Sequence, residues 1–570
     1  MTRMIDRRAL LAVGGAAALA PWLPLWARPV SSGLPTVSGT DIRLKIAHRM
    51  LTIDGRTSHA IGINGTIPGP LVRLREGTTV RLHVENALDE DSSIHWHGLI
   101  LPFHMDGVPG ISFPGIAPGT TFTYEFPVQQ SGTYWYHSHS GLQEQLGHYG
   151  PIVIDPAGPD PVEHDREHVI VLSDHSPMHP HVIFKKLKQM GGYFNRQKQT
   201  LGGLIAGEDQ TLGERLRWGA MRMDPTDISD VTAAAYTYLV NGHGPQDNWT
   251  GLFRPGERVR LRIINASAMS IFNVRIPGLK MMVVQADGLN VRPVTVGEFQ
   301  IGVAETYDVI VVPEDRAYTL VGETSDRSGM ARATLAPRAG MTAPVPPLRK
   351  RPLATMKDMG MGAMGGMDHA TMDHGAMDHG GDHGAMKHSM RDMDLAPTVK
   401  DTPAVQSISP MPVDRTGEAG QGLEDVADAL TYRDLVALDR NPDTRTPSRS
   451  MEIHLTGNME RYMWAFDGVK MNAVKDPIPF RLGERVRVTL VNDTMMTHPI
   501  HLHGHFFELV TGKGDHAPRK HTVNVQPGGK VTFDLTADAP GDWAFHCHLL
   551  YHMHAGMMQV VTVRAPEDAA

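Results

Sequence analysis

The sequence has one cysteine in 570 residues, few aromatic residues and no long apolar run after its amino terminus. A single cysteine excludes a disulfide framework and any thiolate-rich zinc or iron–sulfur site. Acidic residues (62) outnumber lysine and arginine (54), so the chain lacks the basic surface that neutralises phosphates, and we expect no nucleic-acid partner. No later segment reaches about 18 uncharged apolar residues, which predicts no membrane span after processing.

Histidine and methionine are abundant instead, with 31 and 33 residues. Imidazole and thioether groups suit copper in its two oxidation states. The 58 glycines and 41 prolines, combined with 6% aromatic residues, favour a turn-rich all-β chain over a helical bundle.

The amino terminus has the pattern of an export signal. Arg3 and the pair Arg7-Arg8 precede an apolar run over residues 9–20, which is too short to span a bilayer. We predict a twin-arginine signal peptide over residues 1–27, although Asp6 stands where a hydroxyl residue is expected. The twin-arginine export machinery is then a partner and the bacterial periplasm the destination. The alternative is a chance arginine pair before a membrane anchor.

One pattern occurs three times: a glycine, Val-Arg at the third and fourth following positions, and an asparagine at the ninth. The copies are Gly77/Val80/Arg81/Asn86, Gly256/Val259/Arg260/Asn265 and Gly483/Val486/Arg487/Asn492. Each leads into alternating apolar and polar residues, which is typical of a strand with one buried face. We predict three related β-sandwich domains, over residues 36–158, 165–345 and 446–566.

The interval between the second and third copies is longer than the interval between the first and second, and we assign the additional residues to a predicted linker, 346–445. Between 356 and 394 the chain repeats Met-Asp-His at a five-residue step, as at Met367, Met372 and Met377. This composition cannot build an apolar core, so we predict a disordered Met/His-rich insert. Its thioether, imidazole and carboxylate groups favour a copper-gathering tract; the alternative is a solvated linker with incidental methionines.

Four His-x-His pairs in the first and third predicted domains stand out. They are His95-Trp96-His97, His137-Ser138-His139, His501-Leu502-His503 and His546-Cys547-His548. On a strand, residues i and i+2 point to the same side, so each pair presents two imidazoles together. One such pair is weak support for a metal site, but four pairs at related positions predict eight imidazoles converging between the two domains. The second domain has no counterpart of these four pairs at the related positions and is predicted to be a spacer.

Cys547 has a histidine on each side, so its side chain leaves the strand on the opposite face. His552 and Met557 follow it, and His498 precedes it in the same domain. Two imidazoles, a thiolate and a distant thioether are the ligand set of a blue-copper site, whereas the alternative is a buried inert cysteine. The adjoining peptide bonds would connect such a site directly to the paired histidines.

These blocks resemble the four copper-binding motifs of the multicopper oxidases, and segments 253–262 and 461–464 are similar to the bacterial copper-resistance protein A branch. The resemblance implies three cupredoxin-like Greek-key domains with a trinuclear copper cluster between the first and third. It implies type 1 ligands at His498, Cys547, His552 and Met557, type 2 ligands at His95 and His501, and type 3 ligands at His97, His137, His139, His503, His546 and His548. It also implies that Asp106 assists proton delivery to oxygen; an ordinary Asp-Gly turn is the alternative. His554 stands where the family has an acidic residue.

The predicted activity is oxidation of Cu(I), and of phenols as further donors, with reduction of O2 to water. Copper carriers of the periplasm are further candidate partners. Candidates for a cuprous site are Met463, Asp467, Met471, Met495, Met496 and Met558. The alternatives are a laccase-like phenol oxidase and a non-enzymatic copper-sequestering protein. A nitrite reductase gives no reason for four His-x-His pairs.

Overall fold

The computed structural model describes residues 33–361 and 390–565. The predicted signal peptide, 1–27, lies outside the described residues, as do residues 362–389 of the predicted insert. The two ends of that insert are described: residues Met356–Met359 form the 3-10 turn η6, and Met359 is buried. Within the described part of the chain, no helix is long and apolar enough to cross a bilayer.

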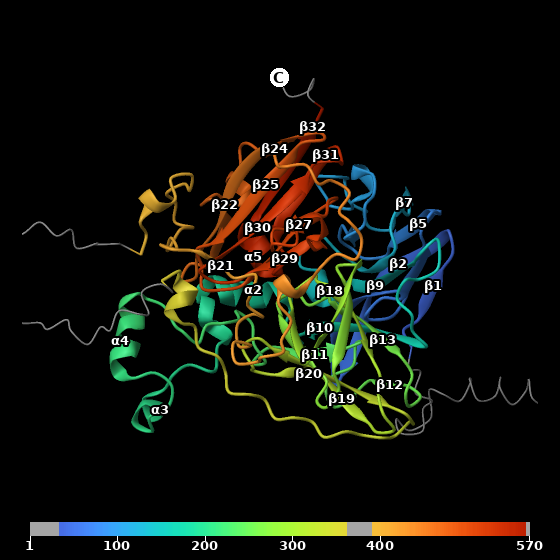
Figure 1. Cartoon of the computed structure of the whole chain (residues 1–570), viewed down its shortest axis with the longest axis horizontal. Coiled ribbons are helices and arrows are strands. Elements are labelled where there is room, and N and C mark those ends of the chain that lie inside the picture. Colours follow the sequence, from blue (N-terminus) through green and yellow to red (C-terminus); the bar gives the residue numbers. More distant parts are fainter. Residues whose placement is uncertain (1–32, 362–389, 566–570) are drawn as a thin grey trace, which may run out of the picture.

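Strands dominate the chain and form six sheets in three consecutive pairs, which follow one another from blue to red in Figure 1. The first pair has the orders β1-β4-β9-β8-β6 and β3-β2-β5-β7. Its strands are β1 (Thr36–Ser38), β2 (Asp41–Ile53), β3 (Arg56–Ile63), β4 (Leu71–Arg75), β5 (Thr79–Asn86), β6 (His95–His97), β7 (Thr121–Pro127), β8 (Gly132–His137) and β9 (Tyr149–Asp155).

The second pair has the orders β11-β10-β13-β18-β15-β16 and β12-β20-β19-β14-β17. Its strands are β10 (Arg166–His175), β11 (Thr237–Val240), β12 (Thr250–Leu252), β13 (Val259–Asn265), β14 (Phe272–Arg275), β15 (Met281–Ala286), β16 (Leu289–Val296), β17 (Glu298–Ile301), β18 (Thr306–Val311), β19 (Tyr318–Thr324) and β20 (Met330–Ala336).

The third pair has the orders β23-β22-β25-β30-β27-β28, with β21 joined to β30, and β24-β32-β31-β26-β29. Its strands are β21 (Val413–Asp414), β22 (Arg449–Asn458), β23 (Met463–Phe466), β24 (Ile478–Arg481), β25 (Arg485–Asn492), β26 (His498–Leu502), β27 (Phe507–Leu509), β28 (Arg519–Lys520), β29 (Thr522–Val525), β30 (Gly529–Thr536), β31 (Gly541–Cys547) and β32 (Met558–Arg564).

The three sequence repeats lie on equivalent strands. β5, β13 and β25 each pair in parallel with an earlier long strand and antiparallel with a later one. The glycine that starts each repeat has φ between +78° and +83°, a conformation that glycine adopts without strain. The asparagine that ends each repeat is buried, and its amide nitrogen donates to a distant backbone oxygen: Asn86 to Ile116, Asn265 to Ile301 and Asn492 to Val525. The repeat therefore marks a turn and the strand that it starts.

Helices are few in residues 33–361 and 390–565, and most of them lie between β10 and β11, where α3 and α4 project from the sheets (Figure 1). The helices are α2 (Pro180–Gln189), α3 (Leu201–Ile205), α4 (Leu212–Ala220) and α5 (Leu550–Ala555), with 3-10 turns η3 (Phe103–Met105), η4 (Glu144–Leu146), η5 (Gly191–Phe194), η9 (Met393–Leu395), η10 (Tyr432–Asp434), η11 (Met471–Ala473) and η12 (Gly514–His516). The all-β prediction is confirmed for the sheets, but it did not include this helical segment. Its helices are short, and α4 starts from a local capping box of Thr211 and Glu214.

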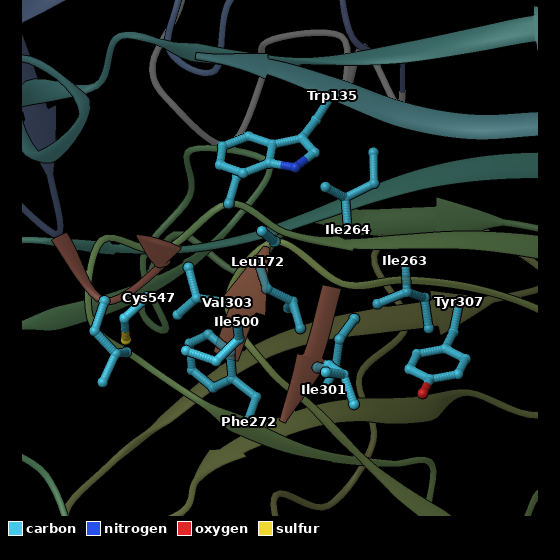
Figure 2. Packing of buried hydrophobic residues seen from close by; sticks show 14 of the residues in the cluster. Trp135, Leu172, Ile263, Ile264, Phe272, Ile301, Val303, Tyr307, Ile500 and Cys547 are labelled. Carbon is cyan, nitrogen blue, oxygen red and sulfur yellow. The ribbon is translucent and has the colours of Figure 1, made fainter. Parts of the chain in front are cut away.

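The first sheet pair has its own apolar core, whereas one continuous core runs through the second and third pairs. Figure 2 shows part of this continuous core, in which Cys547 and Ile500 of the third pair lie near Val303 and Phe272 of the second. Cys547 is fully buried there. The core therefore holds the single thiol in a dry environment.

Candidate metal centres

The strand pairing brings the His-x-His pairs together two by two. His95 on β6 is opposite His137 on β8, and His501 on β26 is opposite His546 on β31. The alternation of side chains along each strand then places both members of a pair on the same face. All eight paired histidines are buried or nearly so, with His139 the most accessible.

The eight imidazoles form three donor groups, in each of which the ligand atoms lie within 4.8 Å of one another. The groups are His95/His97/His501, His97/His137/His548 and His139/His503/His546. Each group contains residues from both the first and the third sheet pairs. The structure therefore brings the eight side chains together as predicted. The last two groups together contain the six residues that the resemblance assigns to the type 3 pair, three in each group.

Hydrogen bonds at the outer ring nitrogen fix the orientation of most of these imidazoles. Nδ1 donates to a backbone oxygen in four of them: His95 to Asp106 at 2.8 Å, His137 to Ser138 at 3.1 Å, His501 to His521 at 2.6 Å and His546 to Cys547 at 3.0 Å. This leaves Nε2 unprotonated and free to bind a metal in the neutral ring.

Several ring nitrogens that face the centre of the cluster lack hydrogen-bond partners in the part of the chain that the structure describes. Among the described residues, the buried Nε2 atoms of His95, His137, His501 and His548 have no hydrogen-bond partner, and neither ring nitrogen of His97 has one. Nε2 of His546 lies 3.0 Å from Nε2 of His503 and 3.4 Å from that of His139. Buried polar atoms without partners are costly, so this pattern fits metal ions bound at the centre of the cluster.

The electrostatics favour the neutral, metal-binding form of the rings. Burial, followed by the neighbouring histidines, lowers the pKa well below its usual range in His97, His137, His139, His501, His503 and His548, and burial lowers the pKa of His546 to about 4. These seven imidazoles therefore favour the neutral form, which can donate a lone pair to a metal.

Asp106 is buried beside this cluster and is not a solvated loop residue. Its Oδ2 lies 2.8 Å from Nδ1 of His503, while its backbone oxygen accepts the bond from His95. Gly107 next to it has φ of +84°, and a Cβ there would lie 1.8 Å from the backbone oxygen of Ile94. The Asp-Gly pair thus packs directly against the strand that carries the first histidines.

A further donor group, separate from the three groups of the histidine cluster, surrounds Cys547 on the opposite face of β31. Its Sγ lies 3.5 Å from Nδ1 of His498 and 3.9 Å from Nδ1 of His552, and these two nitrogens are 3.2 Å apart. The outer nitrogens are held by Thr494, at 2.7 Å from Nε2 of His498, and by Asp230, at 2.6 Å from Nε2 of His552. In this group the Nδ1 atoms of the two histidines face Cys547, whereas in the histidine cluster the Nε2 atoms of His503 and His546 face each other.

The surroundings of the Cys547 thiol favour binding of a cation. Burial raises the pKa of the Cys547 thiol strongly, so a thiolate in this position requires a neighbouring positive charge, which a metal ion would supply. Trp464 stacks on His552 at 3.8 Å between ring centroids. Met557 is buried after α5, and its backbone oxygen accepts a hydrogen bond from the nitrogen of Cys547 at 3.1 Å. Two imidazoles and a thiolate, with the backbone of a buried methionine hydrogen-bonded to that of Cys547, fit copper.

Sequence reasoning did not find Thr494, Asp230 or Trp464. Thr494 stands four residues before His498 and could have been noticed, but Asp230 is separated from His552 by 322 residues and belongs to no motif. Among the candidate cuprous ligands, Met495 and Met496 are buried, while Asp467 accepts a hydrogen bond from the nitrogen of His454. His554 is exposed.

Comparison with known proteins agrees with this geometry. Three family profiles described as multicopper oxidase match residues 45–158, 167–339 and 444–567. A copper resistance protein A homolog of Pseudomonas syringae pv. tomato is 50% identical and aligned over 95% of each chain; copper resistance protein A of Escherichia coli is 48% identical over 94% of each.

Solved structures share the fold. The crystal structure of Fet3p, a multicopper oxidase that functions in iron import, covers 92% of this chain and 90% of its own, with a TM-score of 0.64 at 18% identity. The laccase from Botrytis aclada covers 94% of this chain and 89% of its own, with a TM-score of 0.61 at 21% identity. The fold and the donor groups define a copper-dependent oxidoreductase built from cupredoxin-like sheets. The chain belongs to the multicopper oxidase family.

Proposed function

We propose that the protein is a periplasmic copper-resistance oxidase, which takes single electrons from Cu(I) at the Cys547 centre and uses them to reduce O2 at the histidine cluster. One observation carries the proposal. Cys547 belongs to one donor group, while its chain neighbours His546 and His548 belong to two others. Copper bound in these groups would supply the one-electron redox chemistry.

The overall reaction balances with four electrons. Four Cu(I) ions become four Cu(II) ions, while one O2 and four protons become two water molecules. The chain itself orients the imidazoles and excludes bulk water from the buried cluster. Asp106, whose carboxylate contacts Nδ1 of His503, is the residue we assign to proton delivery.

A group of thioethers that includes a chain neighbour of the proposed ligand His498 favours Cu(I) as the donor. Met495, three residues before His498, packs in a separate buried cluster with Trp218 and Met359. Five more methionines pack against that cluster: Met221, Met223, Met361, Met390 and Met459. Thioethers are soft ligands that prefer Cu(I). Met361 and Met390 also flank residues 362–389, where the sequence repeats methionine and histidine.

The names of two relatives that are about half identical to this chain, copper resistance protein A and a homolog of it, support a role in copper resistance. The amino-terminal arginine pair and apolar run support export by the twin-arginine machinery to the periplasm. A copper carrier of that compartment would then be the partner that supplies Cu(I).

A second candidate is a laccase-like phenol oxidase, favoured by the shared fold with the Botrytis laccase. Its predicted site is the same Cys547 centre, with an aromatic donor in place of Cu(I). A copper-sequestering protein is the third candidate. Storage needs no thiolate joined to a histidine cluster, so the placement of Cys547 argues against storage alone.

Oxygen uptake by purified, copper-loaded protein tests the proposal, with Cys547→Ser as the matched control. We expect uptake with Cu(I) that is lost in the variant, because serine does not provide the soft thiolate ligand. Uptake with phenols alone would identify the laccase-like activity. No uptake with either donor from protein that retains its copper would favour sequestration.

A further inference from the structure

A second buried carboxylate stands beside the histidine cluster, in addition to Asp106. Oε2 of Glu144 lies 2.7 Å from Nδ1 of His137, and both side chains are almost inaccessible to solvent. Glu144 begins the 3-10 turn η4 (Glu144–Leu146), which follows the His137-Ser138-His139 pair along the chain. Its other oxygen, Oε1, is buried without a hydrogen-bond partner among the described residues.

The two carboxylates serve different donor groups. Asp106 contacts His503, a member of the His139/His503/His546 group, whereas Glu144 contacts His137, a member of the His97/His137/His548 group. Within the latter group, neither ring nitrogen of His97 has a hydrogen-bond partner in the described part of the chain, and Nε2 of His548 has none there either. Glu144 is therefore the carboxylate that contacts this group.

The ring of His137 is held from two directions. The indole of Trp135 stacks on its face, with 4.3 Å between ring centroids and 13° between the planes. Glu144 and the backbone oxygen of Ser138 both lie at its Nδ1 edge. Stacking fixes the plane of the ring, and the edge contacts fix which nitrogen points outward, so Nε2 faces the centre of the cluster.

The turn that carries Glu144 is itself fixed by its two glutamine neighbours. Oε1 of Gln143 accepts hydrogen bonds from Ser92 at 2.8 Å and Ser138 at 2.9 Å. On the other side, Gln145 accepts a hydrogen bond from the hydroxyl of Tyr236. With both flanking side chains held in this way, Glu144 is positioned before any metal binds, which is the condition for orienting a ligand.

We propose that Glu144 is a positioning residue of the histidine cluster, which holds His137 so that the His97/His137/His548 group binds its metal ion tightly. This inference rests on the proposed function only in taking the cluster to be the copper site. Outer partners of ligating histidines raise the basicity of the ring and fix its tautomer, and their loss typically weakens metal binding by about 10- to 100-fold.

Copper retention in the full, copper-loaded chain tests the proposal with Glu144→Met and Glu144→Gln. Methionine fills the space without accepting the Nδ1 proton, so we expect about 10- to 100-fold weaker retention of copper at the cluster against a competing chelator. The amide oxygen of glutamine can still accept that proton, so Glu144→Gln should retain copper more strongly than Glu144→Met. The blue absorption of the Cys547 centre should persist in both variants.

The electron paramagnetic resonance spectrum gives a second readout. Two neighbouring Cu(II) ions with coupled spins are silent, so selective loss of one ion should reveal a new signal from the other. The matched control is Glu508→Met, since Glu508 is also buried but contacts Arg485 rather than a histidine. Its copper content and spectrum should equal those of the wild type.

The proposal is overturned if Glu144→Met keeps wild-type copper retention and spectrum, or if Glu144→Gln loses as much copper as Glu144→Met. If Glu144→Met does not fold, Glu144→Ala with added formate replaces it: restored retention supports the positioning role, and absence of rescue overturns it. Failure of the proposed function would look different, since the wild-type protein would then hold its copper without consuming O2.

Discussion

Oδ2 of Asp230 lies 2.6 Å from Nε2 of His552, and the hydroxyl of Tyr462 donates to the same carboxylate oxygen at 2.8 Å. Asp230 belongs to the second segment of the chain, between α4 and β11, whereas His552 and Tyr462 belong to the third. The second pair of sheets carries none of the His-x-His pairs, yet it supplies a side chain that orients a proposed copper ligand. This part of the chain is therefore more than the spacer predicted from its sequence.

Replacing Asp230 by asparagine tests this contact. A carboxylate at Nε2 makes the opposite nitrogen of His552 a stronger ligand, so its loss should weaken copper retention at the Cys547 centre by about 10- to 100-fold and raise the reduction potential. A redox titration of the blue absorption measures the potential. Asp227→Asn, a buried carboxyl three residues earlier, is the control and should change neither quantity. An unchanged potential in Asp230→Asn would show that the contact is only structural.

The sequence predicted the histidine cluster because period-two alternation on a strand is a local property: His95 and His97 share a face wherever that strand lies. Pairing of β6 with β8 and of β26 with β31 then brings the pairs together two by two. Asp230 could not be predicted in this way, since its contact with His552 depends on how distant segments pack. Glu144 follows His137 closely in the chain, but its contact depends on the irregular turn between them, which has no strand periodicity. Asp106 was predicted only through the family resemblance. The ligand roles and domain boundaries stay predictions.

Gly107→Ala should disturb the cluster through the backbone. A Cβ at this position would lie 1.8 Å from the backbone oxygen of Ile94, and the residue has φ of +84°. The left-handed conformation alone costs about 1–2 kcal/mol for alanine, and the clash must also move the turn that carries Asp106. We expect a lower thermal midpoint and weaker copper retention at the cluster. Gly110→Ala, in the same loop with φ of +77° and open space around it, is the control for conformational strain without the clash.

Lys520 is fully buried between two carboxylates of the second segment, with Nζ 3.0 Å from Oδ1 of Asp287 and 3.0 Å from Oε1 of Glu305. Lys520→Met would leave both carboxylates buried without their cation, and breaking such a pair typically costs about 3–5 kcal/mol. Denaturant unfolding should show a loss of this size. Adding Glu305→Gln should recover part of it, because one uncompensated charge is removed. Equal stability of the single and double variants would contradict this account.

Asp467 gives a prediction about pH. Burial raises the pKa of its carboxyl to about 6, and Oδ1 accepts a hydrogen bond from the backbone nitrogen of His454. Because the pKa of the folded state lies above the unfolded value of 3.8, the native protein binds more protons between about pH 4 and pH 6. The free energy of unfolding therefore falls as the pH rises through that window, and it stays reduced above it.

Asp467→Asn removes this cost, because the amide does not ionise and its oxygen can still accept the hydrogen bond from His454. The variant should match the wild type near pH 4 and be more stable at pH 7 by up to about 3 kcal/mol, since each unit of pKa shift corresponds to about 1.4 kcal/mol. Thermal unfolding across this range measures the difference, with the exposed Asp439→Asn as control. A constant difference between variant and wild type at all pH values would mean that packing, and not ionisation, separates them. If copper oxidation is also unchanged in Asp467→Asn, this carboxylate is excluded as a required ligand of Cu(I).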